Sequence, residues 1–214
     1  MKGYTIYLIR HGITDANLEG KYIGLTDSYL SPVGIEEIFD KKEKFYYPPV
    51  QKIYCSPLKR CIQTAALFYP DSYTRLVPEM REMNFGDFEN KKAVDLMERE
   101  DYKEFIKGGL DNPPPGGESI RDMIQRSYEG IDFIISDMMK EGFTTAAVFT
   151  HGGIIMNLLS CFGLPKGRPM DFPCDFAEGY EIHVTAQMWQ RDNAFEIKGL
   201  FPFLKDEDTE ETDD

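Results

Sequence analysis

The sequence predicts an α/β fold of three layers, in which a mostly parallel sheet is flanked by helices on both faces. Short strand-like segments at residues 4–9, 52–55, 74–77 and 146–149 alternate with longer segments of helical spacing. Residues 4–9 and 146–149 are almost continuously apolar, which is typical of strands that are buried on both faces. Alternation of such strands with helices favours parallel pairing, because each crossover helix returns the chain to the same end of the sheet.

The predicted helices begin at recognisable capping residues. Ser31 followed by Pro32 provides an N-cap and a proline at the first helical position. Ser119, with Asp122 three residues later, resembles a capping box, and the apolar residues from 120 to 138 then follow helical spacing. Further helices are expected after Ser56-Pro57, where Arg60 lies, and over residues 154–162, with a weakly patterned one within 91–107.

The C-terminal part predicts a hairpin and then a tail. Residues 180–189 and 195–200 are expected to form two strands joined across residues 191–193. The last ten residues carry seven acids and one lysine without an apolar anchor, which predicts a disordered acidic tail. We therefore expect one domain over residues 1–204 and a tail over residues 205–214.

Composition limits the partners and the compartment. A net charge of -13 argues against a nucleic-acid partner, because binding a phosphate backbone needs a clustered basic surface. No run reaches the roughly 20 apolar residues of a membrane span, and the N-terminus lacks the layout of a signal peptide. Four cysteines without a CxxC pair predict reduced thiols and a cytoplasmic protein. The sequence leaves a homodimer open.

The candidate site residues are polar side chains that follow the buried strands directly. His11 and His151 each follow such a strand and precede a glycine, so that backbone N–H groups can approach an anion there. Arg10 ends the first strand and Arg60 follows the second, and arginine holds phosphate oxygens with two hydrogen bonds at once. A neutral imidazole is a competent nucleophile near neutral pH, so this group of residues suggests phosphoryl chemistry.

An ordered series of motifs resembles the histidine phosphatase superfamily, the phosphoglycerate mutase-like group. The series spans residues 4 to about 160 and consists of Leu8-Ile9-Arg10-His11-Gly12-Ile13-Thr14-Asp15-Ala16-Asn17, Gly24-Leu25-Thr26-Asp27, Leu30-Ser31-Pro32-Val33-Gly34, Ser56-Pro57-Leu58-Lys59-Arg60 with Thr64-Ala65, Arg81-Glu82-Met83-Asn84-Phe85-Gly86-Asp87-Phe88-Glu89, Pro115-Gly116-Gly117-Glu118-Ser119 and Thr150-His151-Gly152-Gly153. The family often has Trp and Gly where this chain has Phe88 and Asn90. This order of motifs is far more specific than a single Arg-His-Gly.

The resemblance implies a role for each matching residue. His11 resembles the nucleophile that becomes phosphorylated, and Glu82 resembles the group that protonates the leaving oxygen and later activates water. The residues that resemble the phosphate-binding set are Arg10, Asn17, Arg60, His151 and Gly152. A carboxyl group beside a phosphate dianion would have a raised pKa, which suits a general acid. Neither a metal ion nor an organic cofactor is implied.

The same residues also have structural, metal-binding and thiol-based explanations. His11 and His151 alone are explained as well by structural hydrogen bonds or by a metal site, but the sequence shows no spacing that would supply further ligands. Cys55 and Arg60 resemble a thiol-phosphatase loop, yet that loop has five residues between them and this chain has four. His183 is expected to be exposed on the polar face of a strand, and Glu118 to be an acid that favours a helix N-terminus.

The sequence therefore predicts hydrolysis of a small phosphorylated metabolite, a phosphomonoester, through a phosphohistidine intermediate. The short segment after Glu82 and the 115–119 loop resemble the α-ribazole phosphatase branch. Two rival functions stay open at this point. One is a phosphoglycerate mutase, which resembles a longer chain with an arginine-rich insert, and the other is a non-catalytic module that binds a phosphorylated ligand.

Overall fold

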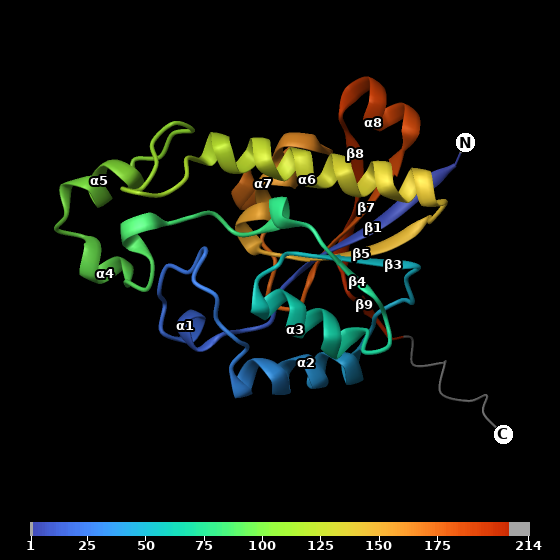
Figure 1. Ribbon diagram of the computed structural model, residues 1–214, viewed down its shortest axis with the longest axis horizontal. Helices are drawn as coiled ribbons and strands as arrows, with labels where there is room; N and C mark the ends of the chain where they lie inside the picture. The colour runs from blue at the N-terminus through green and yellow to red at the C-terminus, as the bar shows by residue number, and fades with distance from the viewer. Residues whose placement is uncertain (1, 206–214) are drawn as a thin grey trace.

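The computed structural model describes residues 2–205, and in this part of the chain a seven-stranded sheet lies between two layers of helices (Figure 1). The strand order is β4-β3-β5-β1-β7-β8-β6. Its strands are β1 (Gly3–Arg10), β3 (Lys52–Cys55), β4 (Thr74–Leu76), β5 (Thr145–Thr150), β6 (Gly163–Leu164), β7 (Gly179–Thr185) and β8 (Phe195–Phe201). Strands β2 (Phe45–Tyr46) and β9 (Phe203–Leu204) form a separate antiparallel pair.

Four of the six pairings in the large sheet are parallel, namely β4 with β3, β3 with β5, β5 with β1, and β8 with β6. Strand β7 runs antiparallel to both β1 and β8. The predicted three-layer α/β fold with a mostly parallel sheet is confirmed.

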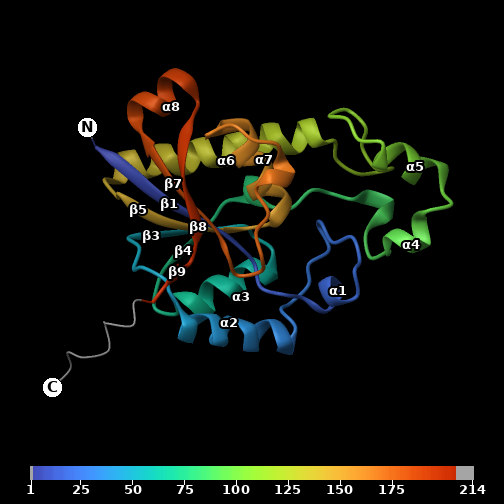
Figure 2. The same cartoon turned by 180° about the vertical axis from the view of Figure 1, so that it is seen from behind.

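The helices are α1 (Asp15–Leu18), α2 (Pro32–Lys44), α3 (Lys59–Phe68), α4 (Ala93–Leu96), α5 (Glu100–Ile106), α6 (Ile120–Glu141), α7 (Gly152–Phe162) and α8 (Ala186–Asp192). Helices α2 and α3 cover one face of the sheet, and α6 and α7 cover the other (Figures 1 and 2). Among residues 2–205, no helix is both long enough and apolar enough to cross a membrane.

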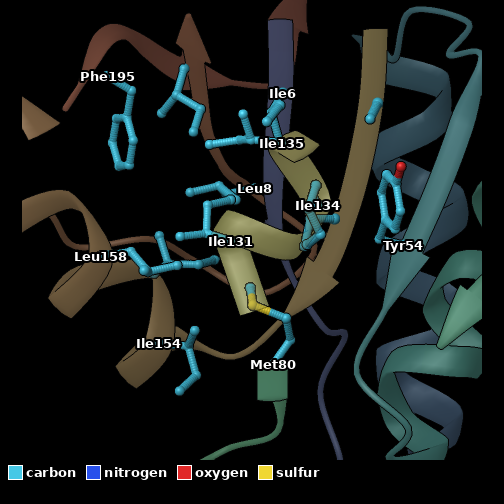
Figure 3. Close-up of a cluster of buried hydrophobic side chains, with 14 of the residues drawn as sticks. Ile6, Leu8, Tyr54, Met80, Ile131, Ile134, Ile135, Ile154, Leu158 and Phe195 are labelled. Atoms are coloured by element: carbon cyan, nitrogen blue, oxygen red, sulfur yellow. The ribbon is translucent and has the colours of Figure 1, made fainter. Parts of the chain in front are cut away.

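Strand β1 separates the two halves of the core. Ile6 and Leu8 belong to the cluster under α6 and α7, where they lie near Ile131 (Figure 3). Tyr7 and Ile9 belong to the cluster on the opposite face, under α2 and α3. Successive side chains of a strand point to opposite faces, so an apolar run of this kind is stable only with helices on both sides. The buried strand predicted from the sequence has this arrangement.

Local capping explains where the main helices begin and end. The Ser31 hydroxyl accepts a hydrogen bond of 3.0 Å from the Gly34 N–H at the start of α2. The Ser119 hydroxyl accepts one of 3.1 Å from the Asp122 N–H at the start of α6. Helix α6 stops at Gly142, whose φ of 84° lies in the left-handed region that favours glycine. Both predicted caps are confirmed.

The predicted C-terminal hairpin is correct in its pairing and wrong in its connection. Strands β7 and β8 pair in antiparallel fashion, but residues 186–192 form helix α8 in place of the end of a strand and a tight turn. The Thr185 hydroxyl caps this helix by accepting from the Met188 N–H, and Asn193 ends it in the left-handed conformation. Packing of Trp189 into the core, at 3% exposure, favours the helix over a continued strand.

A smaller aromatic cluster extends from one end of the sheet. Helices α4 and α5 lie at that end, well beyond the sheet (Figures 1 and 2). Their Leu96 and Tyr102 pack with Phe88, against which Tyr22 and Phe85 also lie. The weakly patterned segment 91–107 is thus two short helices over a local core. Asn90, where the resembling family often has glycine, adopts a φ of 63°, which asparagine tolerates better than most residues.

The division into a domain over residues 1–204 and a tail over residues 205–214 stays a prediction. From residue 206 onward, the predicted tail lies outside the described residues.

Candidate active site

The candidate site lies where three neighbouring parallel strands end. His11 follows β1, Ser56 follows β3 and His151 follows β5. The backbone keeps these ends together, because the His11 N–H donates to the Thr150 carbonyl at 3.0 Å. Open parallel sheets bind ligands at this edge, since the loops that leave the strands converge there. Sheet topology therefore places the two histidines side by side.

Both histidine rings are withdrawn from water and close to each other. Their ring centroids are 5.2 Å apart, and the exposed fractions are 5% for His11 and 0% for His151. Burial lowers the pKa of each imidazole well below 6.5, and the nearby Arg60 charge lowers both further. The two rings are consequently neutral over the physiological pH range.

A hydrogen bond determines which ring nitrogen of His11 is unprotonated. Nδ1 of His11 lies 2.7 Å from the carbonyl oxygen of Gly12, which can only accept, so Nδ1 carries the proton. In this tautomer Nε2 retains its lone pair. Nε2 of His151 lies 2.8 Å from the Ser56 hydroxyl and 3.5 Å from the Cys61 sulfur. The hydrogen bond with Ser56 therefore fixes the orientation of the His151 ring.

Arg10 has one buried side-chain nitrogen without a hydrogen-bond partner among the described residues. Its Nη1 donates to the Cys174 carbonyl at 2.8 Å, and its guanidinium lies over the Phe176 ring, 3.7 Å from the centroid. Its buried Nε has no hydrogen-bond partner in the described part of the chain. A buried guanidinium nitrogen without an acceptor is costly unless an anion completes it. A Cβ on Gly152 would lie 3.2 Å from this nitrogen, so glycine leaves room for the arginine.

Arg60 shows the same pattern at the first turn of α3. Its side chain is 0% exposed, and its two terminal nitrogens donate to the carbonyls of Thr26 and Gly24 at 2.8 Å each. Its Nε is likewise without a partner among residues 2–205. The floor of the site thus holds two guanidinium groups, each with one donor that nothing in the described chain satisfies.

The loop that anchors Arg60 is itself organised by Glu89. This carboxylate accepts hydrogen bonds from the Thr26 hydroxyl and from four backbone N–H groups, those of Gly24, Leu25, Thr26 and Phe85. Burial alone would raise the pKa of Glu89, but these donors, the Thr26 hydroxyl first, lower it below its ordinary value. The sequence places Glu89 in a family motif but does not predict this role, because most of its partners are 63 to 65 residues away in the chain.

The Glu82 carboxylate reaches the N-terminus of α7 and lines the same cavity as His11. It accepts from the neighbouring Met83 N–H at 2.9 Å and from the Gly153 N–H at 3.3 Å. Burial raises its pKa, and these hydrogen bonds and the arginines offset the rise only in part. The raised pKa expected of a general acid is therefore present before any phosphate binds.

A cavity of about 430 Å³ opens above these groups, and its lining includes Arg10, His11, Asn17, Glu82 and Gly152. Arg60 and His151 are fully buried and are not among its lining residues. The Asn17 side-chain oxygen accepts from the Thr14 N–H and hydroxyl as part of a capping box. The remaining lining residues form the mouth of the cavity and are Lys21, Tyr22, Ile23, Phe85, Gly153, Met156, Pro173, Cys174 and Asp175.

The other weighed residues lie apart from this cavity. Cys55 is fully buried, and burial raises the pKa of its thiol, which makes it a poor nucleophile. The expectation that His183 is exposed is wrong in degree, since it is half-buried against Gly3. Among residues 2–205, no group of three or more His, Cys, Asp or Glu side chains is placed to hold a metal ion.

Comparison with known proteins gives a consistent result. A family model described as the histidine phosphatase superfamily (branch 1) matches residues 6–194. An adenosylcobalamin/alpha-ribazole phosphatase of Escherichia coli is 29% identical over 79% of this chain and 85% of its own length. A protein of Hydrogenobacter thermophilus provisionally named phosphoserine phosphatase 2 is 28% identical over 85% and 90%. The crystal structure of the alpha-ribazole phosphatase from Shigella flexneri superposes with a TM-score of 0.78 at 24% identity, covering 95% of this chain and 99% of that one, which shows a shared fold.

Proposed function

The chain belongs to the histidine phosphatase superfamily (branch 1), and from this membership we propose that it hydrolyses a small phosphomonoester with His11 as the nucleophile. It is a phosphatase, as the names of its relatives indicate. The observation that carries the proposal is the group of four basic side chains at the cavity, of which Arg10 and His11 line it and Arg60 and His151 are fully buried. The two neutral imidazoles lie 5.2 Å apart, and each guanidinium group retains a buried Nε–H without a partner among residues 2–205. This set of groups matches a tetrahedral dianion.

In the first step the lone pair of His11 Nε2 attacks phosphorus, and the bond from phosphorus to the alcohol oxygen breaks. The protonated Glu82 carboxyl gives its proton to that oxygen, so the alcohol leaves neutral. In the second step water attacks the phosphohistidine, Glu82 takes a proton from this water, and phosphate leaves while His11 regains its lone pair. Arg10 and Arg60 stabilise the charge on the equatorial oxygens in both steps.

His151, Asn17 and Gly152 complete the proposed phosphate site. The His151 ring lies 5.2 Å from that of His11 and is held in its orientation by Ser56, so we propose that it donates a hydrogen bond to a phosphate oxygen. Gly152 begins α7, and the N-terminus of this 11-residue helix favours a bound anion. These residues were named from the sequence, and their proximity supports the roles proposed for them.

For the substrate we propose α-ribazole phosphate or a close analogue. Tyr22, Phe85, Met156 and Pro173 give the mouth of the cavity an apolar character. Such a wall favours an alcohol that carries a flat apolar ring, because burying that ring releases water from both surfaces. A carboxylate-bearing alcohol such as glycerate gains nothing from these apolar side chains, and the same lining offers it one repelling and one attracting charge, Asp175 and Lys21.

A cytoplasmic location is part of the proposal. All four cysteines are described and free, which fits a reducing compartment. The absence of nucleic-acid and membrane partners, and a homodimer, remain predictions from the sequence.

The test is a panel of phosphorylated metabolites that includes α-ribazole phosphate, phosphoserine and 3-phosphoglycerate, with released phosphate as the readout. We expect the highest kcat/KM for α-ribazole phosphate. A higher kcat/KM for phosphoserine would make phosphoserine the preferred substrate, and the proposed reaction would still hold. Interconversion of phosphoglycerates stimulated by 2,3-bisphosphoglycerate would favour the mutase, and stoichiometric phosphate binding without turnover of any compound would contradict catalysis.

A further inference from the structure

A buried ion pair outside the cavity holds the segment that carries Glu82. Arg126 lies in α6 and Glu118 in the loop before it, and their side chains are 10% and 13% exposed. The pair is bidentate, with Nε of Arg126 donating to one carboxylate oxygen of Glu118 at 2.8 Å and Nη2 donating to the other at 2.7 Å. This planar arrangement fixes both side chains in one orientation.

The remaining donors of Arg126 all bind backbone of the Glu82 segment. Its Nη1 donates to the carbonyls of Glu79 and Arg81, at 2.6 and 2.8 Å. Its Nη2 also reaches the carbonyl of Glu82 itself, at 3.5 Å. One side chain of the long helix α6 therefore binds three backbone carbonyls between residues 79 and 82.

Glu118 holds the same segment on its other side. Its carboxylate accepts from the Asn84 N–H at 3.3 Å, and its own N–H donates to the Asn84 carbonyl at 2.9 Å. Glu82 thus lies between two anchored stretches of backbone. Within the described part of the chain, its carboxylate accepts only from the N–H groups of Met83 and Gly153, so its position follows that of the backbone.

An ion pair with this burial is weak evidence for a stabilising role. Removing two charges from water costs about as much as their attraction returns, and apolar replacements are often neutral for stability. The same helix carries a second pair, Arg75 with Asp137, which are 2.6 Å apart, and Asp137 also accepts from the Tyr54 hydroxyl. That pair joins α6 to β4 and touches no residue of the cavity lining.

We propose that Arg126 and Glu118 are positioning residues, which hold the backbone of residues 79–84 so that the Glu82 carboxyl faces the leaving oxygen. This role rests on the function proposed above. Proton transfer requires contact within hydrogen-bond distance, and a shift of about 1 Å in a supporting element can cost ~10²-fold in rate. Loosening the pair should therefore affect the steps that move a proton and spare the transfer of phosphorus to His11.

The experiment compares two substrates that differ in their need for a proton. Glycerol phosphate releases an alkoxide that must be protonated, whereas p-nitrophenyl phosphate releases a stable anion. We expect Arg126→Met and Glu118→Gln to lower kcat/KM for glycerol phosphate by ~10- to 100-fold, and the pre-steady-state burst of nitrophenolate by less than about threefold. Arg126→Lys keeps the charge and should recover part of the loss, which also guards against a misfolded methionine variant.

Arg75→Met and Asp137→Asn are the matched controls, since they break the other pair on the same helix. They are expected to leave the ratio between the two substrates unchanged. The positioning role would be overturned if the Arg126 and Glu118 variants lost equal activity on both substrates, or if the controls changed the ratio of the two activities. In either case the wild-type enzyme would still turn over, so the proposed function would stand. A wild-type protein that releases no phosphate from either compound would overturn the proposed function as well.

Discussion

The imidazole rings of His11 and His151 meet at 5.2 Å between centroids, with 62° between their planes, although the two residues lie far apart in the chain. Strands β1 and β5 are parallel neighbours, and Arg10 is paired with Thr150 in their register. The next residue of each strand is therefore a histidine at the same height on the same edge. This one register places the proposed nucleophile beside its partner.

Replacing the proposed nucleophile should abolish covalent chemistry. We expect His11→Ala to lower phosphatase activity by at least ~10³-fold, because the variant lacks the imidazole nitrogen to which the phosphoryl group is transferred in the proposed first step. Acid-labile phosphate trapped on the protein should disappear with it, as measured by rapid quench with labelled substrate. His183→Ala, at the remaining histidine, is the control and should keep both signals. Phosphate trapped at an undiminished level on His11→Ala would rule out this nucleophile.

Chelation should leave the activity unchanged. The proposed steps use only imidazole, carboxyl and guanidinium groups, so incubation with EDTA followed by gel filtration should alter kcat by less than about twofold. Steady-state assays before and after treatment measure this. A large loss that added Mg²⁺ or Zn²⁺ restores would contradict the proposed chemistry.

The pH profile of kcat/KM should reflect one lowered and one raised pKa. His11 must be neutral to attack, and its lowered pKa keeps it so well below pH 6.5. Glu82 must be protonated to serve as the acid, and its raised pKa extends the protonated form above the ordinary range, until activity falls as the pH rises through that pKa. Glu82→Gln should lower kcat by ~10²- to 10⁴-fold and remove the alkaline limb. Persistence of that limb in the variant would assign it to another group.

Acid should destabilise the fold through the buried histidines. Their folded-state pKa values are lowered, so below pH 6.5 the unfolded chain binds protons that the native state does not. Stability is thus complete above this pH and is lost as the pH falls, by about 1.4 kcal/mol per pH unit for each histidine. Urea unfolding between pH 5 and about 6.5, without phosphate, should show a smaller slope for His151→Asn. An unchanged slope would mean that His151 is protonated in the native state.

Glu89 should support Arg60 through the loop between them. Glu89→Gln places an amide where five donors now meet a carboxylate, so we expect a loss of about 2 to 3 kcal/mol in the free energy of unfolding. The KM should rise, because the Gly24 and Thr26 carbonyls that hold Arg60 lose their anchor. Asp87→Asn, at a neighbouring exposed acid, is the control for both measurements. Equal effects of the two substitutions would contradict a specific role for Glu89.

The sequence determined those features that depend on neighbouring residues. The buried strands at residues 4–9 and 146–149 and the caps Ser31 and Ser119 were predicted correctly, because strand periodicity and capping involve only residues a few positions apart. The residues at the strand ends, with Arg10 and His11 foremost, could be named for the same reason. Motif order added Glu82, which composition alone could not have distinguished from the acids around it.

The tertiary structure alone decided how these residues are held. The carbonyls of Glu79 and Arg81 that bind Arg126 come from a segment far away in sequence. The same is true of four of the five donors around Glu89 and of the loop carbonyls that bind Arg60. Helix α8 took the place of the last residues of a predicted strand and of the turn after it, where Trp189 packs into the core at 3% exposure. Short-range spacing determines which reactive side chains follow the strands. The orientation of these side chains depends on long-range hydrogen bonds and on burial, which arise only when the chain has folded.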